Sequence, residues 1–376
     1  MKLKVYCLIH NNIKMKQKTL FLLASVLVFI LIGCKRQKDV HIVKVGVILP
    51  LSGEVASYGN DCREGILYAN IADSLGVNYI FEDSKGDPKT AIAAFNKLTT
   101  IDNVEYVIGD MFSNTTLSLS PLSKRQQKLL ISPTASSKEI SKDNIYALSV
   151  FPCETYESKI VADFAKSHYS KVGVLYEKIA AAQTMRDAYI ENLDNDLLVF
   201  DESFESTTTT FREIVYKIKQ SGCEALYLIT YSNNAIKIIN KIKELGVLVD
   251  LIGQSALYDP SLLEYLADYK SDFYLTGPLF NMKNTDEMSI KFITGYTEAF
   301  NKEPNQMSSQ GYVAAIVAKD LYKYIKNRTY SKSIVLGYHN SFFGYDFQFN
   351  DDLTSMSGLR LYKYEEGNYN PITNER

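Results

Sequence analysis

The feature that most restricts the fold of this chain is an alternation of short apolar runs with stretches of helical spacing. Residues 43–49 (VKVGVIL) become continuously apolar toward their end, as expected of a parallel strand that is covered on both faces. Asp87-Pro88 then provides a helix N-cap followed by proline at the first helical position. Further apolar runs follow at 79–82, 106–108 and 129–131. This order of strands and helices predicts a doubly wound parallel sheet.

The alternation begins a second time after residue 170. Three strand-like runs are separated by helical stretches: 172–176, 225–229 and 251–252. A long amphipathic helix is expected at 311–326, and short antiparallel strands within 342–364. Two such units predict an α/β protein of two doubly wound lobes, with a ligand cleft between them.

The N-terminal residues have the pattern of a bacterial lipoprotein signal peptide. Residues 19–32 (TLFLLASVLVFILI) form an uncharged apolar run that follows Lys16 and Lys18 and leads to Gly33-Cys34, which resembles a lipobox. We expect 1–33 to be removed, Cys34 to be lipidated, and 34–41 to form a tether. The protein would then be anchored to a bacterial membrane on its extracytoplasmic side. A transmembrane anchor is the alternative, because the run approaches the length needed to span a bilayer.

Charge and cysteine usage exclude several classes of protein. The chain has a formal net charge of −2, and removing residues 1–33, which carry five lysines and no acid, leaves about −7. A nucleic-acid-binding protein would show a basic excess instead. Cys62, Cys153 and Cys223 are widely spaced and form no metal-ligand pattern. The sequence also has no recognisable catalytic motif, so we expect a protein without cofactor, metal or enzymatic activity.

The order of several short motifs is similar to that of a known family. Residues 45–53 (VGVILPLSG) and 56–59 (ASYG) resemble the opening of type 1 periplasmic binding proteins, in particular the leucine/isoleucine/valine-binding branch that serves ABC transporters. Similar motifs follow in family order: Glu82-Asp83 to Asp87-Pro88, 107–109 with Ser113, 131–136, 172–175, Tyr231, Gly253 and Gly311-Tyr312.

This resemblance implies two lobes that are joined by three crossovers and close on a ligand. It assigns residues 42–151 and 279–337 to lobe 1, and residues 152–278 and 338–376 to lobe 2.

The resemblance also implies a site for the ligand's carboxylate. Ser113 matches a hydroxyl that follows the third strand, and Thr134, Ala135 and Ser136 match a second contact loop. The residues themselves agree, because Ser136 to Glu139 has the S-x-x-E pattern of a capping box and Ser113 also precedes a helix start. Two helix N-termini facing one cleft would attract an anion. The alternative is that both serines are only N-caps.

Two tyrosines match positions where the family contacts its ligand. Tyr58 corresponds to an aromatic wall over the ligand, although ordinary packing is the alternative. Tyr231 corresponds to a residue of the second lobe that closes on the ligand.

The end of the site that binds the ligand's amine departs from the family pattern. Ala181 lies where the family has a Tyr-Gly pair, and the position of the acid that pairs with the ammonium falls on Ser255, by ungapped counting from Gly253. Glu154 could supply the missing charge, but a solvated acid at a helix start is the simpler interpretation. The sequence therefore favours a carboxylate or amide ligand without an α-amino group.

The function implied is a substrate-binding lipoprotein of an ABC importer. Its partners would be a small amino-acid-like, carboxylate or amide ligand and the permease subunits, with no nucleic acid. The alternative is an envelope lipoprotein of the same fold that acts as a sensor or regulates a partner such as a peptidoglycan synthase.

Overall fold

A computed structural model describes residues 42–372, except 195, 279, 281 and 356–358. The signal-peptide run, Cys34 and the tether 34–41 lie outside the described residues. The first sheet is entirely parallel and has the strand order β2-β1-β3-β4-β5. Its strands are β1 (Val43–Leu49), β2 (Val77–Asp83), β3 (Tyr106–Gly109), β4 (Leu130–Ser132) and β5 (Ala147–Ser149).

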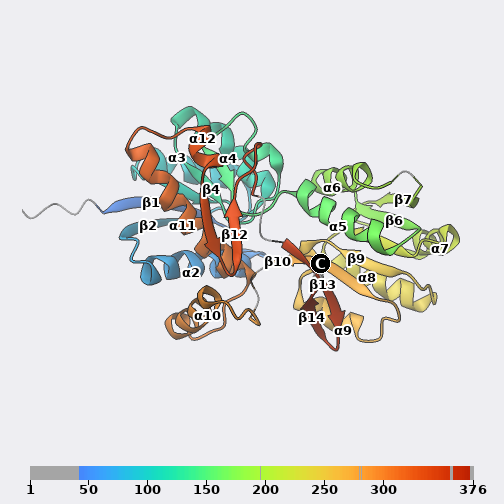
Figure 1. The fold of residues 1–376 in the computed structure, drawn as a ribbon. Helices are drawn as coiled ribbons and strands as arrows, with labels where there is room; N and C mark the ends of the chain where they lie inside the picture. The colour runs from blue at the N-terminus through green and yellow to red at the C-terminus, as the bar shows by residue number, and fades with distance from the viewer. Residues whose placement is uncertain (1–41, 195, 279, 281, 356–358, 373–376) are drawn as a thin grey trace, which may run out of the picture. The chain divides into compact units, whose positions relative to one another are not determined.

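Helices cover both faces of the first sheet (Figure 1). Alternate residues of β1 show this: Val45, Val47 and Leu49 enter one core and Ile48 enters another. The first core is completed by α2 (Ala56–Ala72), α10 (Glu287–Phe300) and α11 (Gln306–Lys326). The second is completed by α3 (Pro88–Thr100) and α4 (Ser113–Gln126). A strand buried on both faces explains the continuous apolar run at the end of β1.

The second sheet has seven strands in the order β14-β13-β10-β9-β8-β6-β7. Five of them are parallel: β6 (Val172–Glu177), β7 (Leu198–Phe204), β8 (Ala225–Ile229), β9 (Asp250–Gly253) and β10 (Phe273–Pro278). The strands β13 (Leu359–Glu365) and β14 (Asn368–Pro371) add antiparallel pairs at one edge.

Helices also cover both faces of this second sheet. One face is packed by α5 (Glu154–His168) and α6 (Ala180–Glu191), and the other by α7 (Arg212–Ser221), α8 (Ser232–Glu244) and α9 (Leu263–Leu266). The chain passes between the two sheets three times, after β5, after β10 and before β13. Two doubly wound lobes and three crossovers confirm the predicted fold class.

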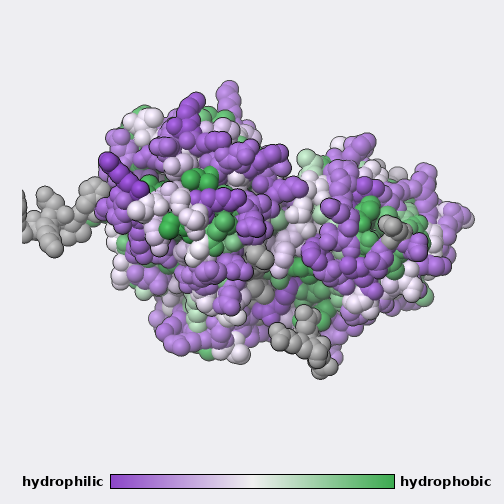
Figure 2. Space-filling model, turned by 45° about the horizontal axis from the view of Figure 1, so that its top comes forward, coloured by the Kyte–Doolittle hydropathy of each residue, from purple (hydrophilic) through white to green (hydrophobic). Residues whose placement is uncertain are grey.

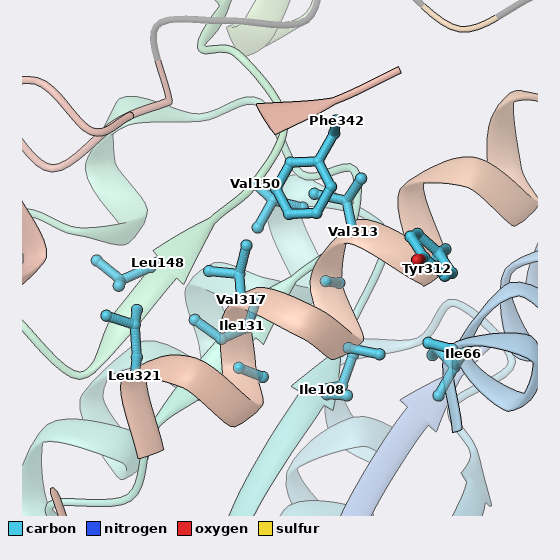
Figure 3. Close-up of a cluster of buried hydrophobic side chains, with 14 of the residues drawn as sticks. Ile66, Ile108, Ile131, Leu148, Val150, Tyr312, Val313, Val317, Leu321 and Phe342 are labelled. Atoms are coloured by element: carbon cyan, nitrogen blue, oxygen red, sulfur yellow. The ribbon is translucent and has the colours of Figure 1, made fainter. Parts of the chain in front are cut away.

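The C-terminal segment differs from the predicted lobe boundary. A hairpin of β11 (His339–Phe342) and β12 (Tyr345–Gln348) follows the short helix α12 (Lys332–Leu336). Phe342 and Phe347 are buried in the core of the first lobe, and Figure 3 shows Phe342 beside Val150 and Val313. The hairpin thus departs from the expected assignment of 338–376 to lobe 2, whereas β13 and β14 lie in the second sheet beside β10. Burial of these aromatic side chains in the first-lobe core favours this position of the hairpin.

The visible surface is mainly hydrophilic, with apolar residues in small separate groups (Figure 2). Among the helices of the described ranges, none is long and apolar enough to cross a membrane.

Candidate functional site

Two loops at the carboxyl edge of the first sheet meet at a serine. Ser113, the first residue of α4, follows β3, and its hydroxyl oxygen accepts hydrogen bonds from the backbone N–H groups of Ser136 (3.1 Å) and Ser137 (3.3 Å). Both of these belong to the loop that follows β4. The hydroxyl proton of Ser113 stays available for a further acceptor, because the oxygen takes part in these bonds only as an acceptor. The two predicted contact loops are thus brought together.

The expected second helix N-terminus is absent from this loop. Lys138–Ile140 forms a single 3₁₀ turn, and the residue that caps it is Ser137, whose hydroxyl accepts from the N–H of Glu139 at 3.4 Å. The side chain of Glu139 pairs with Lys142 at 2.8 Å and does not complete a capping box. The chain must also reach β5 within a few residues, which leaves no room for a helix. Of these two loops, the one after β3 leads into an α-helix, α4, and the one after β4 does not.

Thr134 and Ala135 fix the shape of the second loop. The hydroxyl of Thr134 donates to the carbonyl oxygen of Met111 at 2.8 Å, and the N–H of Ala135 donates to the hydroxyl of Ser132 at 3.0 Å. The methyl group of Ala135 is buried in the core under α3 and α4. These contacts tie the loop after β4 to the loop after β3, so the donors around Ser113 are held in place before a ligand arrives.

Asp83 joins the neighbouring loops of the same edge. Its carboxylate accepts from the N–H of Leu51 (2.8 Å), the hydroxyl of Ser52 (2.5 Å) and the N–H of Lys85 (2.9 Å). Partial burial opposes ionisation, but these hydrogen bonds outweigh it and lower the pKa of Asp83. Asp83 therefore acts as a fixed bridge between the loops after β1 and β2.

The predicted aromatic contacts have large exposed areas. Tyr58 lies in α2 of the first lobe and is 45% exposed, while Tyr231 precedes α8 of the second lobe and is 56% exposed. Ala181 is half-buried near the start of α6. The exposure of Tyr58 argues against ordinary core packing, which was its alternative interpretation.

Glu154 differs from its simpler interpretation as a solvated acid. It is the first residue of α5, it is only 3% exposed, and its backbone N–H donates to the carbonyl oxygen of Ser136 at 3.0 Å. Burial raises the pKa of Glu154 to about 7, against smaller opposing effects from hydrogen bonds, one of them with the Ser136 side chain, and from Lys138. The first crossover thus places a buried carboxyl group next to the loop that matches the ligand's carboxylate site.

Sequence reasoning missed Glu157, which lies one turn further along α5. Its carboxylate accepts from the N–H of Ser255 at 2.5 Å, from the hydroxyl of Ser255 at 3.1 Å and from the hydroxyl of Thr276. Glu157 is 3% exposed, and burial raises its pKa despite these hydrogen bonds. An acid is therefore present at Ser255, but it comes from α5. The signal in the sequence was the spacing of three residues between Glu154 and Glu157, which places both on one helix face.

A third buried acid stands at the carboxyl edge of the second sheet. Glu177, the last residue of β6, is 5% exposed and accepts from the hydroxyl of Thr230 at 2.6 Å. Thr230 directly follows β8 and precedes Tyr231. Ligands of open α/β sheets bind at this edge, beyond the carboxyl ends of the strands.

Comparison with known proteins decides the family. The sequence model of the family described as periplasmic binding protein matches residues 42–335. The chain belongs to this family. Among curated relatives, the leucine-, isoleucine-, valine-, threonine- and alanine-binding protein of Pseudomonas aeruginosa is 24% identical over 290 residues, which are 68% of this chain and 75% of that protein. A Leu/Ile/Val-binding protein homolog of Brucella melitensis is 24% identical over 57% of this chain, and the match spans 61% of that relative's length.

Solved structures agree on the type 1 fold of this periplasmic binding protein. A branched-chain amino acid transporter substrate-binding protein from Streptococcus pneumoniae, in complex with isoleucine, has a TM-score of 0.74 at 18% identity and covers 88% of this chain and 99% of its own. A solute-binding protein of an ABC transporter from Rhodopseudomonas palustris, in complex with 4-hydroxybenzoate, has a TM-score of 0.76 at 15% identity. The match covers 88% of this chain and 95% of that protein. The predicted resemblance to the leucine/isoleucine/valine-binding branch is confirmed.

Proposed function

We propose that this periplasmic binding protein is the substrate-binding component of an ABC importer and takes up a small amino-acid-like, carboxylate or amide ligand between its two lobes. The observation that carries the proposal is the junction of Ser113 with the backbone of Ser136 and Ser137 beside the N-terminus of α4. The two N–H groups occupy the Ser113 oxygen as an acceptor and leave its O–H donor, at the N-terminus of α4, for an anionic group. The names of the relatives, which bind amino acids or aromatic acids, support a ligand of this class.

Binding itself would require no chemical step. A ligand that contacts both lobes stabilises the closed arrangement by its higher affinity for that state. In the first lobe, the ligand contacts would be Ser113, Thr134, Ala135, Ser136 and Tyr58. In the second lobe and the first crossover they would be Glu154, Ala181, Tyr231 and Ser255. The permease subunits would receive the ligand from the loaded protein.

We also propose that the protein is a lipoprotein that is anchored to the membrane through Cys34. The support is the position of Cys34 at the end of the apolar run 19–32. Mass spectrometry of the full chain purified from membranes tests this. We expect an N-terminal peptide that begins at a lipid-modified Cys34, and an unprocessed N-terminus would contradict the proposal.

A ligand screen tests the binding function. The full chain, solubilised in detergent, is heated with amino acids, carboxylates, amides and short peptides in turn. A ligand at a hundred times its dissociation constant should add about 2.7 kcal/mol to the free energy of unfolding, which shifts the melting temperature measurably. A stabilising ligand that carries a carboxylate or amide supports the proposal. Absence of any shift over the panel contradicts it and would favour an envelope regulator that binds a protein partner.

A further inference from the structure

A group of lysines and arginines lies at the amino edge of the first sheet, the edge at which its five parallel strands begin. Lys44 is the second residue of β1, and its ammonium group donates to the carbonyl oxygen of Asp102 at 3.4 Å, in the loop that leads into β3. Lys128 precedes β4 and donates to a carbonyl oxygen of the same loop at 2.7 Å. Lys124 and Arg125 lie in the last turn of α4, which leads into β4. These segments thus bring four cations to one edge.

The end of α11 brings further cations to the same edge. The ring centroid of Tyr322 lies 5.0 Å from that of Tyr106, the first residue of β3. The hydroxyl of Tyr330 donates to the carbonyl oxygen of Ile145, which precedes β5, at 2.5 Å. These contacts hold the end of α11 and the turn after it at the amino edge. Three exposed cations belong to this segment: Lys326, Arg328 and Lys332.

The seven cations give the amino edge an excess of positive charge. None of them forms an ion pair with an acid of the described residues, whereas Lys97 and Lys323 nearby do. In the described loops that lead into the strands, the acids without an ion pair are fewer: Asp73, Glu105 and Asp143. The excess contrasts with the net charge of about −7 for the chain after residue 33.

Stabilisation of helix ends explains only part of this group. Lys124, Arg125 and Lys326 lie in last helical turns, where a cation interacts favourably with the helix dipole. Lys44 in β1 and Arg328 after α11 lie outside helices. These two cations therefore need another explanation.

The corresponding edge of the second sheet has a different charge. Lys171 precedes β6, but Glu224 directly precedes β8, Asp250 begins β9 and Asp272 directly precedes β10. A doubly wound sheet thus does not need cations at its amino edge. The positive charge is a property of the first lobe.

Exposed apolar side chains lie at the same edge as the cations. Ile101, which follows α3 in the loop before β3, is 70% exposed, Ile71 at the end of α2 is 63% exposed, and Tyr324 near the end of α11 is 39% exposed. Cations attract anionic lipid headgroups, and apolar side chains enter the boundary between headgroups and acyl chains. The combination therefore suits the surface of a bilayer.

The proposed lipid anchor is close to this edge along the chain. Val43, the first residue of β1, is nine residues after Cys34. A chain of this length spans at most about 32 Å when fully extended. Its sequence adds three cations, Lys35, Arg36 and Lys38, against one acid, Asp39. An anchor at Cys34 would thus hold the amino edge within a short distance of the bilayer.

We propose that the amino edge of the first sheet docks on the anionic headgroups of the bilayer to which Cys34 is anchored. The inference rests on the proposed anchoring and goes beyond it, because a flexible anchor alone leaves the orientation of the folded chain free. With the cations on the bilayer, the carboxyl edge of the first sheet, which carries Ser113, points away from the membrane toward the medium that holds the ligand.

Two labelled variants of the full-length lipoprotein test this orientation. Ile101→Cys places a thiol at the amino edge, and Leu248→Cys is the matched control, because Leu248 is 71% exposed in the loop before β9 of the second lobe. The described native cysteines are buried, so a thiol-reactive fluorophore selects the new position. Each protein is added to phosphatidylcholine vesicles, with or without phosphatidylglycerol, that contain a lipid with a nitroxide quencher on its headgroup. We expect phosphatidylglycerol to increase quenching severalfold at Ile101 and to leave it unchanged at Leu248.

Charge variants in the Ile101→Cys background identify the cause. The test variant replaces four exposed cations of the amino edge: Lys124→Gln, Arg125→Gln, Lys326→Gln and Arg328→Gln. The control changes the net charge equally by replacing four exposed lysines of the second lobe: Lys171→Gln, Lys219→Gln, Lys237→Gln and Lys270→Gln. Each cation near an anionic surface contributes about fivefold to binding, so the docked population should fall by about a hundredfold or more in the test variant only. Salt at about 1 M, where the Debye length is about 3 Å, should also abolish the added quenching.

Flotation of the vesicles reports on the anchor separately. A protein that floats with both kinds of vesicle but shows no added quenching at Ile101 is anchored as proposed, and the docking inference is overturned. Equal increases at Ile101 and Leu248, or an increase that persists in the test variant, overturn it as well. If the Ile101 label stays away from the bilayer while the amino edge binds polyglutamate in solution, the partner is an acidic polymer and the inference is wrong. A protein that floats with neither kind of vesicle refutes the anchoring at Cys34, and the inference fails with it.

Discussion

The two edges that face the proposed ligand use different chemistry. At the first-lobe edge, neutral hydroxyl and N–H groups of Ser113, Thr134 and Ser136 join the loops after β3 and β4, and Asp83 joins the loops after β1 and β2. At the start of α5 and the second-lobe edge, Glu154, Glu157 and Glu177 are buried carboxyl groups. Hydrogen bonds thus hold the loops of the first edge together, whereas Glu154 at the second edge keeps one buried carboxyl oxygen without a hydrogen-bond partner among the described residues.

Mutations at the two edges should therefore differ in what they change, ligand affinity at the first edge and the free energy of unfolding at the second. Removing a donor from the neutral edge should reduce ligand affinity and change stability little, because water can replace a half-buried hydroxyl. Changing a buried acid should alter the free energy of unfolding and its pH dependence even without ligand, because the charge has been taken out of water. The following experiments test that separation.

The largest effect should come from removing both serine hydroxyls of the neutral edge. In Ser113→Ala/Ser136→Ala, the Ser113 donor to a charged ligand group is lost together with the Ser136 hydroxyl that hydrogen-bonds Glu154, which should cost about 3 to 6 kcal/mol, or more than a hundredfold in affinity. The melting temperature of the empty protein should stay within a few degrees. Calorimetry with a ligand from the screen gives the affinity. Ser118→Ala, on the same helix α4, is the matched control and should bind normally, and an unchanged affinity in the double variant would refute the assignment.

The next effect concerns Glu154 in the ligand-free protein. Its pKa is raised from 4.5 to about 7, so the folded protein holds this proton over a pH range in which the unfolded chain has lost it. The free energy of unfolding should therefore fall as pH rises from about 4.5 to about 7, by about 3 kcal/mol. Urea denaturation at a series of pH values measures this contribution as the difference between the protein and Glu154→Gln.

The control for that experiment is an exposed acid in an equivalent helix position. Glu213 lies in the first turn of α7 with its side chain 87% exposed. Glu213→Gln should have the same pH dependence as the unchanged protein. If Glu154→Gln also retained the full decrease, the titration would have to be assigned to another group.

A smaller effect is expected for Glu157→Gln. The amide replaces one acceptor oxygen by an NH₂ group that faces the donors of Ser255 and Thr276, which should lower the free energy of unfolding by about 2 kcal/mol. Glu177→Gln is the comparison, since its amide oxygen can still accept from Thr230 and the loss should be smaller. Chemical denaturation at one pH measures both variants, and equal losses would contradict the structural role given to the contacts of Glu157.

The smallest effects should come from the exposed tyrosines. Tyr231→Phe and Tyr58→Phe each remove one neutral hydroxyl and should lower affinity by less than 1 kcal/mol, with no change in the melting temperature. Tyr216→Phe is the control, because Tyr216 is as exposed as Tyr231 but lies on α7. If both site variants bind as tightly as the control variant, the two hydroxyl groups do not take part in ligand binding.

Much of the fold could be predicted because local patterns determined it. The apolar runs at 45–49, 106–109 and 225–229 are buried on both faces of parallel sheets, and such runs have few alternatives. The sequence did not indicate which lobe the hairpin 339–348 packs against. Its strands and their register depend on neighbouring residues, whereas the residues it packs against are distant in the chain. Phe342 and Phe347 pack against residues of the first lobe that lie more than a hundred positions earlier in the chain, as well as against α11.

Part of the candidate site could likewise be predicted from local sequence, and part could not. The meeting of Ser113 with the loop of Ser136 was predictable, since both follow neighbouring parallel strands whose carboxyl ends share one edge. The capping-box pattern at Ser136 predicted a helix that did not form, because Glu139 pairs with Lys142 and the chain turns into β5. Glu157 was missed because only folding brings it to Ser255, 98 residues away in the sequence.

Local patterns account for the two doubly wound lobes, the family and the meeting of Ser113 with the loop of Ser136, since helix spacing, loop motifs and the sequence of elements along the chain can be recognised locally. Tertiary structure alone decided the charge of the other edge. Whether Glu154 is a solvated acid or a buried one depends on how completely the first crossover is covered. Whether Ser255 lacks an acid depends on which helix packs against it. Burial and long-range contacts set the ionisation of a carboxyl group, and neither can be read from its neighbours in the chain.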